Sequence, residues 1–179
     1  MNSRKLWINI HLVFAAIFMP LMLMMPITGS LYLLGYQGDQ TKTEVFRIHE
    51  TAPNDEMERE EFFRKHLAAQ GIDPTFEYIR STKTEFIMRP TTRVYYVANI
   101  ESDKTLIISR VEPTMLKRLI ELHKGHGPRA MRWFEAAFGL ALIITTLSGL
   151  WLAWTVKPYR MITLSAFGAG LLIMLVCLF

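Results

Sequence analysis

The chain has 179 residues, of which 51% are hydrophobic and 20% charged, with a formal net charge of +4. A mean hydropathy of +0.20 in a chain that is one-fifth charged indicates segregated apolar and polar segments, as in a membrane protein. The single cysteine, Cys177, excludes a disulfide framework and any zinc or iron–sulfur site made of one chain's cysteines. The charge balance and the lack of a basic run interleaved with aromatics indicate no nucleic-acid partner.

The first apolar stretch covers residues 6–36 and contains no charged side chain. At about 1.5 Å per residue, such a helix is longer than the roughly 30 Å hydrocarbon core of a bilayer. A cleaved signal peptide would have an apolar region of only about 7–15 residues, followed by a small-residue cleavage site. Residues 1–36 are therefore predicted to be an uncleaved signal anchor and the first transmembrane helix.

Two more apolar stretches lie near the end of the sequence. Residues 133–156 are interrupted only by Glu135, and residues 161–179 carry no charge. They predict transmembrane helices over residues 129–156 and 161–179, joined by a hairpin loop at 157–160. Small residues on these helices favour close packing into a three-helix bundle, with self-association as a further expectation.

The orientation of the chain is predicted from the charges that flank the short loops. Arg4 and Lys5 precede the first span, and Lys157 and Arg160 lie between the second and third. Two crossings separate the clusters, so both can face the cytoplasm, as the positive-inside rule requires. The N-terminus is then cytoplasmic, the loop at 157–160 is cytoplasmic, and residues 37–132 are extracytoplasmic.

Residues 37–113 have the composition of a small soluble α+β domain. Asn54 is expected to cap a helix over residues 55–70, which Gly71 ends. Segments rich in β-branched or aromatic residues predict strands at 43–49, 76–81, 84–89, 93–100 and 105–111. Residues 101–104 read as the last hairpin turn. The expected fold is one helix packed on an antiparallel meander.

Residues 114–128 connect this domain to the second span. Thr114 is a candidate N-cap for an amphipathic helix that reaches His123, and we expect this helix to lie along the outer membrane interface. Gly125, Gly127 and Pro128 then turn the chain into the membrane.

Two segments resemble a known family. Residues 4–35 have a basic start, an early histidine and a late Thr28-Gly29 pair. Residues 121–154 begin with a Leu-His-x-Gly sequence and carry a late Ser148-Gly149 pair. Both are similar to helices of PepSY-associated transmembrane proteins, and the helix and strands between them are compatible with a PepSY domain.

The resemblance implies an α-helical membrane protein with three transmembrane helices and a small PepSY-like α+β domain outside the bacterial cytoplasmic (inner) membrane. Members of the family include membrane reductases that carry b-type haem and reduce ferric siderophore complexes in the periplasm. Other members are short proteins of three or four helices, which this chain resembles more. The resemblance therefore leaves open whether the chain is itself an enzyme or a subunit of a haem reductase.

Histidine is the residue type to examine, because neutral imidazole is a common axial ligand of haem iron. His49 and His66 lie among charged residues of the soluble domain and are expected at its surface. His11 lies in the first span, where polar residues tend to be functional. His123 and His126 lie at the outer end of the second span. These last three are the candidate haem b-binding residues, and His11 and His123 are the candidate iron ligands.

The predicted topology limits how these histidines can act. His11 near the cytoplasmic side and His123 near the outer side are separated by roughly 30 Å of bilayer core, so they cannot ligate one iron. A second axial ligand would come from another protomer, a partner subunit or a methionine. On one helix, His123 and His126 would share a face, which suits a metal ion, but the glycines around them favour a helix end.

Two other kinds of site receive less support. The methionines of the first span could favour Cu(I), but no histidine or cysteine accompanies them, so helix packing explains them better: Met19, Met22, Met24 and Met25. The sequence has no phosphate loop, nucleophile elbow, zinc-protease motif or dinucleotide fingerprint.

The leading hypothesis is a haem b-binding electron-transfer or periplasmic iron-reduction and iron-uptake subunit. It would contact the lipid bilayer and act as a homo-oligomer or with a partner membrane or periplasmic subunit. The alternative is a non-catalytic interaction or regulatory module, in which the helices anchor an outward domain that binds a periplasmic partner. A small transporter is not indicated, because the spans lack paired ionisable residues at mid-depth.

Overall fold

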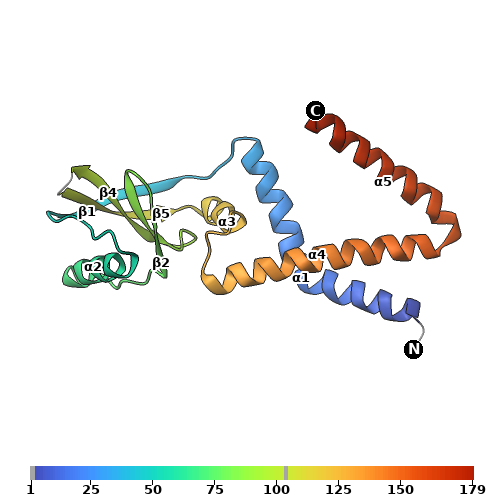
Figure 1. Cartoon of the computed structure of the whole chain (residues 1–179), viewed down its shortest axis with the longest axis horizontal. Coiled ribbons are helices and arrows are strands. Elements are labelled where there is room, and N and C mark those ends of the chain that lie inside the picture. Colours follow the sequence, from blue (N-terminus) through green and yellow to red (C-terminus); the bar gives the residue numbers. More distant parts are fainter. Residues whose placement is uncertain (1–2, 103–104) are drawn as a thin grey trace. The chain divides into compact units, whose positions relative to one another are not determined.

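The computed structural model describes residues 3–102 and 105–179. The chain divides into two compact units (Figure 1). One unit comprises Met1–Leu23 and Ala136–Phe179, and the other comprises Met24–Glu135.

Four strands follow one another in the middle of the chain, and three consecutive helices end it, an α+β pattern. The helices are α1 (Ser3–Leu33), α2 (Glu56–Ala69), α3 (Met115–His123), α4 (Arg129–Thr155) and α5 (Lys157–Leu178). The strands are β1 (Gln40–Ile48), β2 (Tyr78–Ser81), β3 (Glu85–Arg89), β4 (Tyr95–Ser102) and β5 (Thr105–Pro113).

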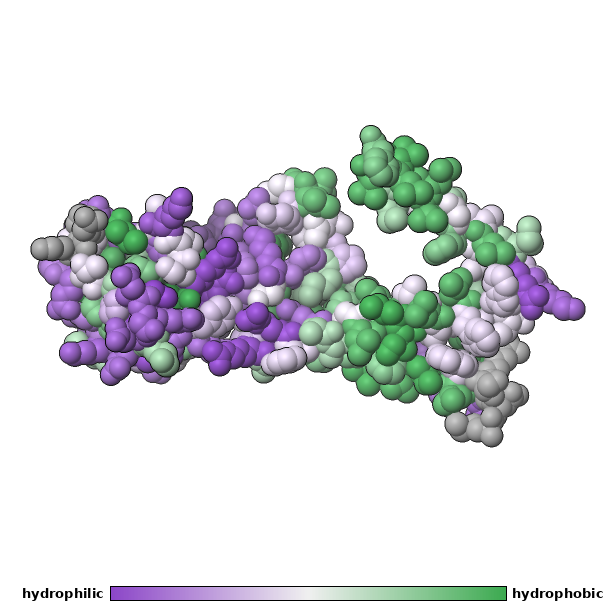
Figure 2. Space-filling model, viewed as in Figure 1, coloured by the Kyte–Doolittle hydropathy of each residue, from purple (hydrophilic) through white to green (hydrophobic). Residues whose placement is uncertain are grey.

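Three of the helices, α1, α4 and α5, are long and apolar enough to cross a membrane. Hydrophobic side chains cover their surface, whereas hydrophilic side chains dominate the surface of the sheet and α2 (Figure 2). The three apolar helices expected from the sequence are therefore present. The chain is a membrane protein, and its broad fold class is α+β.

The loop predicted at residues 157–160 is wrong. These residues form the first turn of α5, and only Val156 separates α4 from α5. Pro158 is compatible with this position, because the first N–H groups of a helix have no partner within it and the fixed φ of proline suits a helix start. The third apolar helix thus begins at Lys157, before the predicted residue 161.

Close packing in the first unit involves α1 and α4. Phe18 of α1 and Phe138 of α4 are both buried, and their ring centroids lie 5.9 Å apart. None of the residues of α5, all of which are described, has a buried side chain. The predicted packing of all three helices into a bundle is therefore not found.

The five strands form one open antiparallel sheet in the order β1-β5-β4-β3-β2. Strands β2 to β5 are successive neighbours and make the predicted meander. The chain passes through α2 between β1 and β2, and β1 pairs with β5 at the opposite edge from β2 (Figure 1). A bulge interrupts the pairing of β1 with β5 between Glu44 and Phe46. Each predicted strand is present, with ends displaced by a few residues; the turn predicted at 101–104 includes residues 103–104, which lie outside the described part.

The start of α2 differs by one residue from the prediction. Asp55, not Asn54, is the N-cap, and its side chain accepts hydrogen bonds from the backbone N–H groups of Met57 (2.9 Å) and Glu58 (3.1 Å). Both residue types cap helices well, and the ionised carboxylate also interacts favourably with the helix dipole. Gly71 follows the helix with φ +70°, as expected for the residue that ends it.

The core of the second unit lies between α2 and one face of the sheet. Phe63 and Leu67 of α2 are fully buried against Met88, Ala98 and Ile108 of three adjacent strands. These strand residues lie on one face because alternate side chains of a strand point to the same side.

Helix α3 begins where β5 ends and is held by the segment that follows α1. Thr114 caps α3, as predicted, by accepting a hydrogen bond from the backbone N–H of Lys117. Its own backbone N–H donates to the carbonyl oxygen of Asp39 (2.9 Å). Gly38 has φ +70°, and a Cβ there would lie 2.5 Å from the nitrogen of Lys117, so only glycine fits this approach.

The capping contacts predict that Asp55→Ala destabilises α2 by about 1 kcal/mol, because two helix N–H groups lose their acceptor. Amide hydrogen exchange of the full chain in detergent measures this as faster exchange in the first turn of α2. Asn54→Ala is the matched control, and its exchange should equal that of the unmodified chain. Faster exchange in the Asn54 variant alone would contradict the assignment.

Candidate functional site

His11 on α1 is hydrogen-bonded to α4. Its Nδ1 lies 3.0 Å from the hydroxyl oxygen of Ser148 and 3.2 Å from the carbonyl oxygen of Thr145. The Ser148 hydroxyl donates its proton to the same carbonyl (2.9 Å). A carbonyl only accepts, so Nδ1 of His11 carries the proton and donates. In the neutral ring, the lone pair is then on Nε2.

His123, at the end of α3, makes the same kind of contact with α1. Its Nδ1 lies 3.1 Å from the hydroxyl oxygen of Thr28, and that hydroxyl donates to the carbonyl oxygen of Met24 (2.8 Å). With the hydroxyl proton donated to Met24, the Thr28 oxygen accepts from Nδ1–H, and Nε2 carries the lone pair. Among the described residues, Nε2 of neither His11 nor His123 has a recorded hydrogen bond.

A glycine follows each hydroxyl residue and lies under the imidazole ring. A Cβ at Gly29 would be 3.2 Å from Cε1 of His123, which is tighter than ordinary contact. A Cβ at Gly149 would be 3.5 Å from Cε1 of His11. We call the His11–Ser148–Gly149 and His123–Thr28–Gly29 arrangements the two histidine sites. The sequence singled out both hydroxyl–glycine pairs but did not connect them to the histidines.

The two histidine sites belong to different units of the chain, so each stands as a site with one imidazole. Within the described residues, no three His, Cys, Asp or Glu side chains come together as a metal-binding group. The prediction that haem b is bound through His11, through His123, or through both in an oligomer stays a prediction. Each site fits a single axial ligand of haem, because metal-binding imidazoles typically donate their other N–H to a neighbouring acceptor.

His126 has a different environment from His123. Gly125 (φ +71°) ends the helix between them, and Nδ1 of His126 lies 2.7 Å from Oε2 of Glu121. The shared helix face considered for these two histidines is therefore absent. The binding of haem by His126 remains a prediction. Of the other two histidines, His49 is exposed, as expected, and His66 bonds through Nδ1 to the carbonyl of Phe62 (2.8 Å).

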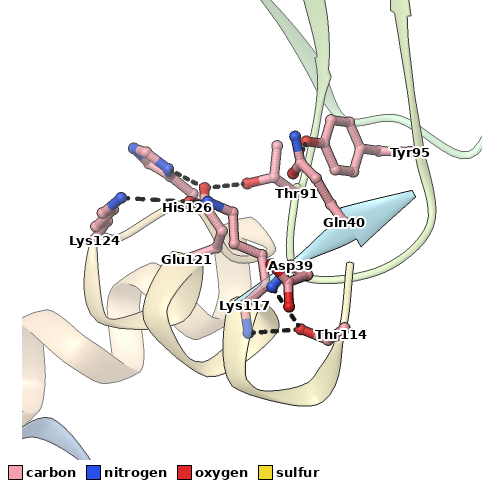
Figure 3. Close-up of polar contacts among 9 residues, drawn as sticks. All are labelled: Asp39, Gln40, Thr91, Tyr95, Thr114, Lys117, Glu121, Lys124 and His126. Atoms are coloured by element: carbon pink, nitrogen blue, oxygen red, sulfur yellow. Dashed lines mark hydrogen bonds and ion pairs between the residues drawn. The ribbon is translucent and has the colours of Figure 1, made fainter. Parts of the chain in front are cut away.

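Glu121 is the centre of a polar cluster that the sequence did not indicate (Figure 3). Its Oε2 accepts hydrogen bonds from the hydroxyl of Thr91 (2.8 Å) and from His126. Its Oε1 lies 3.7 Å from Nζ of Lys117 and 3.5 Å from Nζ of Lys124. The backbone N–H of Thr91 also donates to the carbonyl of His126 (3.2 Å). The cluster thus ties the β3–β4 connection to α3 and to the turn before α4.

The protonation equilibria of the cluster follow from its contacts. Burial alone would raise the pKa of Glu121, but hydrogen bonds from His126 and Thr91, with the charge of Lys124, lower it overall. Burial lowers the pKa of His126, and the charges of Arg89 and Lys124 lower it further, against the hydrogen bond to Glu121. At neutral pH the cluster therefore contains an ionised carboxylate and a neutral imidazole.

Acidification is predicted to weaken this cluster. Both pKa values are lowered by folding, so each group's stabilisation is complete above its ordinary value and is lost as the pH falls through its lowered one. His126 begins this loss below its ordinary value of 6.5, and Glu121 follows below 4.5. Amide protection factors at the end of α3, which correct for the slower intrinsic exchange at low pH, should therefore fall as the pH falls from neutral to 5, and less so in His126→Gln.

The matched control is His49→Gln, which removes an exposed histidine and should leave the pH dependence unchanged. Glu121→Gln removes the ion pairs and weakens two hydrogen bonds, at a cost of about 1–3 kcal/mol at neutral pH. An equal fall of the protection factors in the unmodified chain and in the His126 variant would contradict the role of His126.

Comparison with known proteins finds a family that includes the helices of both histidine sites. The family described as the PepSY-associated TM region matches residues 1–157, which include both sites and the whole sheet. No curated protein and no solved structure matches the chain. A family match over most of the sequence confirms the resemblance seen in its first and fourth helices: the chain belongs to the PepSY-associated TM family.

Proposed function

We propose that this PepSY-associated membrane protein is a haem b-binding electron-transfer subunit that serves iron reduction or iron uptake at the bacterial cytoplasmic membrane. The observation that supports it best is the state of the two imidazoles. Each ring donates Nδ1–H to a hydroxyl that itself donates to a backbone carbonyl of its own helix. The lone pair of each imidazole is therefore on Nε2. This is the arrangement that fixes the tautomer of metal-binding histidines.

His11 and His123 are the residues that would hold haem iron, each at its own site. Ser148 and Thr28 fix the rings, and Gly149 and Gly29 leave room for them against the helices. Bound haem b would supply a one-electron carrier. Since each site offers one imidazole, the second axial ligand is proposed to come from another copy, a partner subunit or a methionine.

The spectrum of the purified chain tests this proposal. Full-length protein from cells supplied with haem should show a reducible b-type absorption spectrum in detergent. His11→Ala and His123→Ala should each remove the absorbance of one site, because each deletes an iron ligand. His49→Ala, which removes an exposed histidine, should leave the spectrum unchanged.

Variants of the two hydroxyl residues test the orientation of the imidazole rings separately from their binding to iron. Thr28→Val and Ser148→Ala remove the acceptor of Nδ1–H but keep the imidazole, so haem affinity should fall about 10–100-fold at the affected site. Thr28→Ser keeps the hydroxyl and should retain the affinity. A colourless protein, or haem binding that survives both histidine substitutions, would refute the proposal.

The alternative proposal is a non-catalytic module in which the sheet binds an extracytoplasmic partner. It is favoured by the two open edges of the sheet, β1 and β2, since a polypeptide strand can pair with an open edge. In that case both histidine substitutions leave partner binding intact, whereas substitutions that disrupt the sheet, at Tyr96 of β4 or Ile107 of β5, abolish it.

The proposed orientation places the sheet outside the cytoplasm. A phosphatase that is active only outside the cytoplasm, inserted near residue 80, should be active, and a fluorescent protein that matures only in the cytoplasm should be dark there. The expectation follows from the basic residues Lys157 and Arg160 in the first turn of α5, next to its junction with α4. The opposite pair of results would reverse the topology and the side of the membrane assigned to each histidine site.

A further inference from the structure

The first turn of α4 carries two arginines at the point where the chain enters its second apolar span. Arg129 and Arg132 are both exposed, and Arg132 is the last basic residue before the apolar run that ends at Val156. Residues three apart on a helix are neighbours on its surface, with Cβ atoms about 5–6 Å apart. The two guanidinium groups therefore extend from one side of α4. We call these two residues the arginine pair.

The positive charge of the arginine pair is not compensated by the described part of the chain, where no ion pair involves Arg129 or Arg132. Glu77, which precedes β2, uses its Oε2 to accept the backbone N–H of Arg129 (2.8 Å). Glu135, one turn further along α4, has its Oε2 3.9 Å from the position that a Cβ at Gly125 would take. Like charges at the spacing of the pair destabilise a helix, so an anion bound between them would stabilise it.

The contacts that the arginine pair makes leave its charge available. Nη2 of Arg129 donates to the backbone carbonyl of Glu77 (3.4 Å), and Cζ of Arg132 lies 5.7 Å from the ring centroid of Tyr78. A carbonyl and an aromatic ring orient a guanidinium without neutralising it, and most of its N–H donors remain for another acceptor. The binding groups are therefore the two side chains and not the end of the helix, because Glu77 already occupies the N–H of Arg129.

The neighbouring residues place the arginine pair at the surface of a lipid bilayer. Helix α4 is long and apolar enough to cross a membrane, and the pair lies in its first turn. Trp133 follows the pair directly and is 78% exposed, and tryptophans of membrane proteins are enriched at the level of the lipid headgroups. The aliphatic part of an arginine can lie along the apolar surface while its guanidinium stays among these headgroups.

We propose that Arg129 and Arg132 together bind the phosphodiester of an anionic phospholipid. Guanidinium groups form strong charge-assisted hydrogen bonds with phosphate oxygens, often two at a time. The headgroup of phosphatidylglycerol leaves its phosphate negative, whereas the choline of phosphatidylcholine neutralises the phosphate of the same lipid. A lipid phosphate is favoured over a free anion because the bilayer holds it at the level of Trp133. The proposal depends neither on haem nor on the side of the membrane on which the sheet lies.

The fluorescence of Trp133 reports which lipid lies next to the arginine pair. Full-length chain with Trp7→Phe, Trp151→Phe and Trp154→Phe retains Trp133 as its only tryptophan. It is reconstituted into bilayers of phosphatidylglycerol and phosphatidylcholine with the same acyl chains, one of the two lipids carrying bromine near the headgroup end of its chains. Bromine quenches tryptophan on contact, so brominated phosphatidylglycerol should quench Trp133 more than brominated phosphatidylcholine does at the same mole fraction.

Substitution of the arginine pair should remove this preference. Arg129→Gln and Arg132→Gln should each lower the relative affinity for phosphatidylglycerol about fivefold, which corresponds to the roughly 1 kcal/mol of a basic residue near an anionic membrane surface. Arg129→Lys and Arg132→Lys keep the charge and should retain the preference, which separates loss of charge from displacement of the helix. The matched control is Lys65→Gln at an exposed lysine of α2, which should leave the preference unchanged. Equal quenching by the two brominated lipids before any arginine is replaced, or an equal loss in the Lys65 variant, would overturn the proposal.

Salt distinguishes a lipid headgroup from a free anion at the arginine pair. Potassium chloride should lower the preference for phosphatidylglycerol gradually, because it screens charges at the membrane surface. Potassium phosphate of equal ionic strength should lower it by the same amount. A larger loss in phosphate would show that the pair takes free phosphate, and the assignment to a lipid would then be wrong.

Discussion

Each histidine site depends on a hydroxyl that donates its proton to a backbone carbonyl of its own helix. Thr and Ser in a helix donate to the carbonyl three or four residues earlier, as Thr28 and Ser148 do, which leaves their oxygens as acceptors. A buried imidazole N–H without an acceptor would cost about 1–3 kcal/mol, so the ring turns Nδ1 toward the hydroxyl. At Thr28 the adjacent Gly29 eases this approach, since a Cβ there would lie 3.2 Å from the ring, whereas a Cβ at Gly149 would make ordinary contact at 3.5 Å. One residue pair on a helix therefore sets both the position and the tautomer of a histidine from another helix.

Glu121 carries a structural charge, because the fold surrounds its carboxylate with partners. Glu121 is surrounded by hydrogen-bond donors and by two lysines, and all these partners come from the segments that it joins. Its charge is therefore accounted for by the fold.

Local sequence patterns predicted the helices and strands of this fold, but not their exact boundaries or the contacts between them. Hydropathy and length identified the three apolar helices, and β-branched segments identified the strands, because both signals lie within one element. The cap of α2 was misplaced because Asn54 and Asp55 have the same preference, and only the backbone decides between neighbours. The loop at 157–160 was wrong because Lys-Pro is typical of turns and equally of helix starts. The contacts of His11 and His123 join residues far apart in sequence, which no local pattern reveals.

The absence of packing on α5 bears on where the second haem ligand would come from. In water, an apolar helix with no buried residue would require a partner, but lipid tails solvate such a helix as well as protein does. The exposure of α5 is therefore no argument for an interface. His11 on α1 differs in this respect, because its Nε2 carries a lone pair that lipid tails cannot coordinate or hydrogen-bond, whereas His123 is exposed at the end of α3, outside the three apolar helices. A partner copy or subunit is thus more reasonably placed at His11 than along α5, and its ligand would have to approach the face on which Nε2 lies.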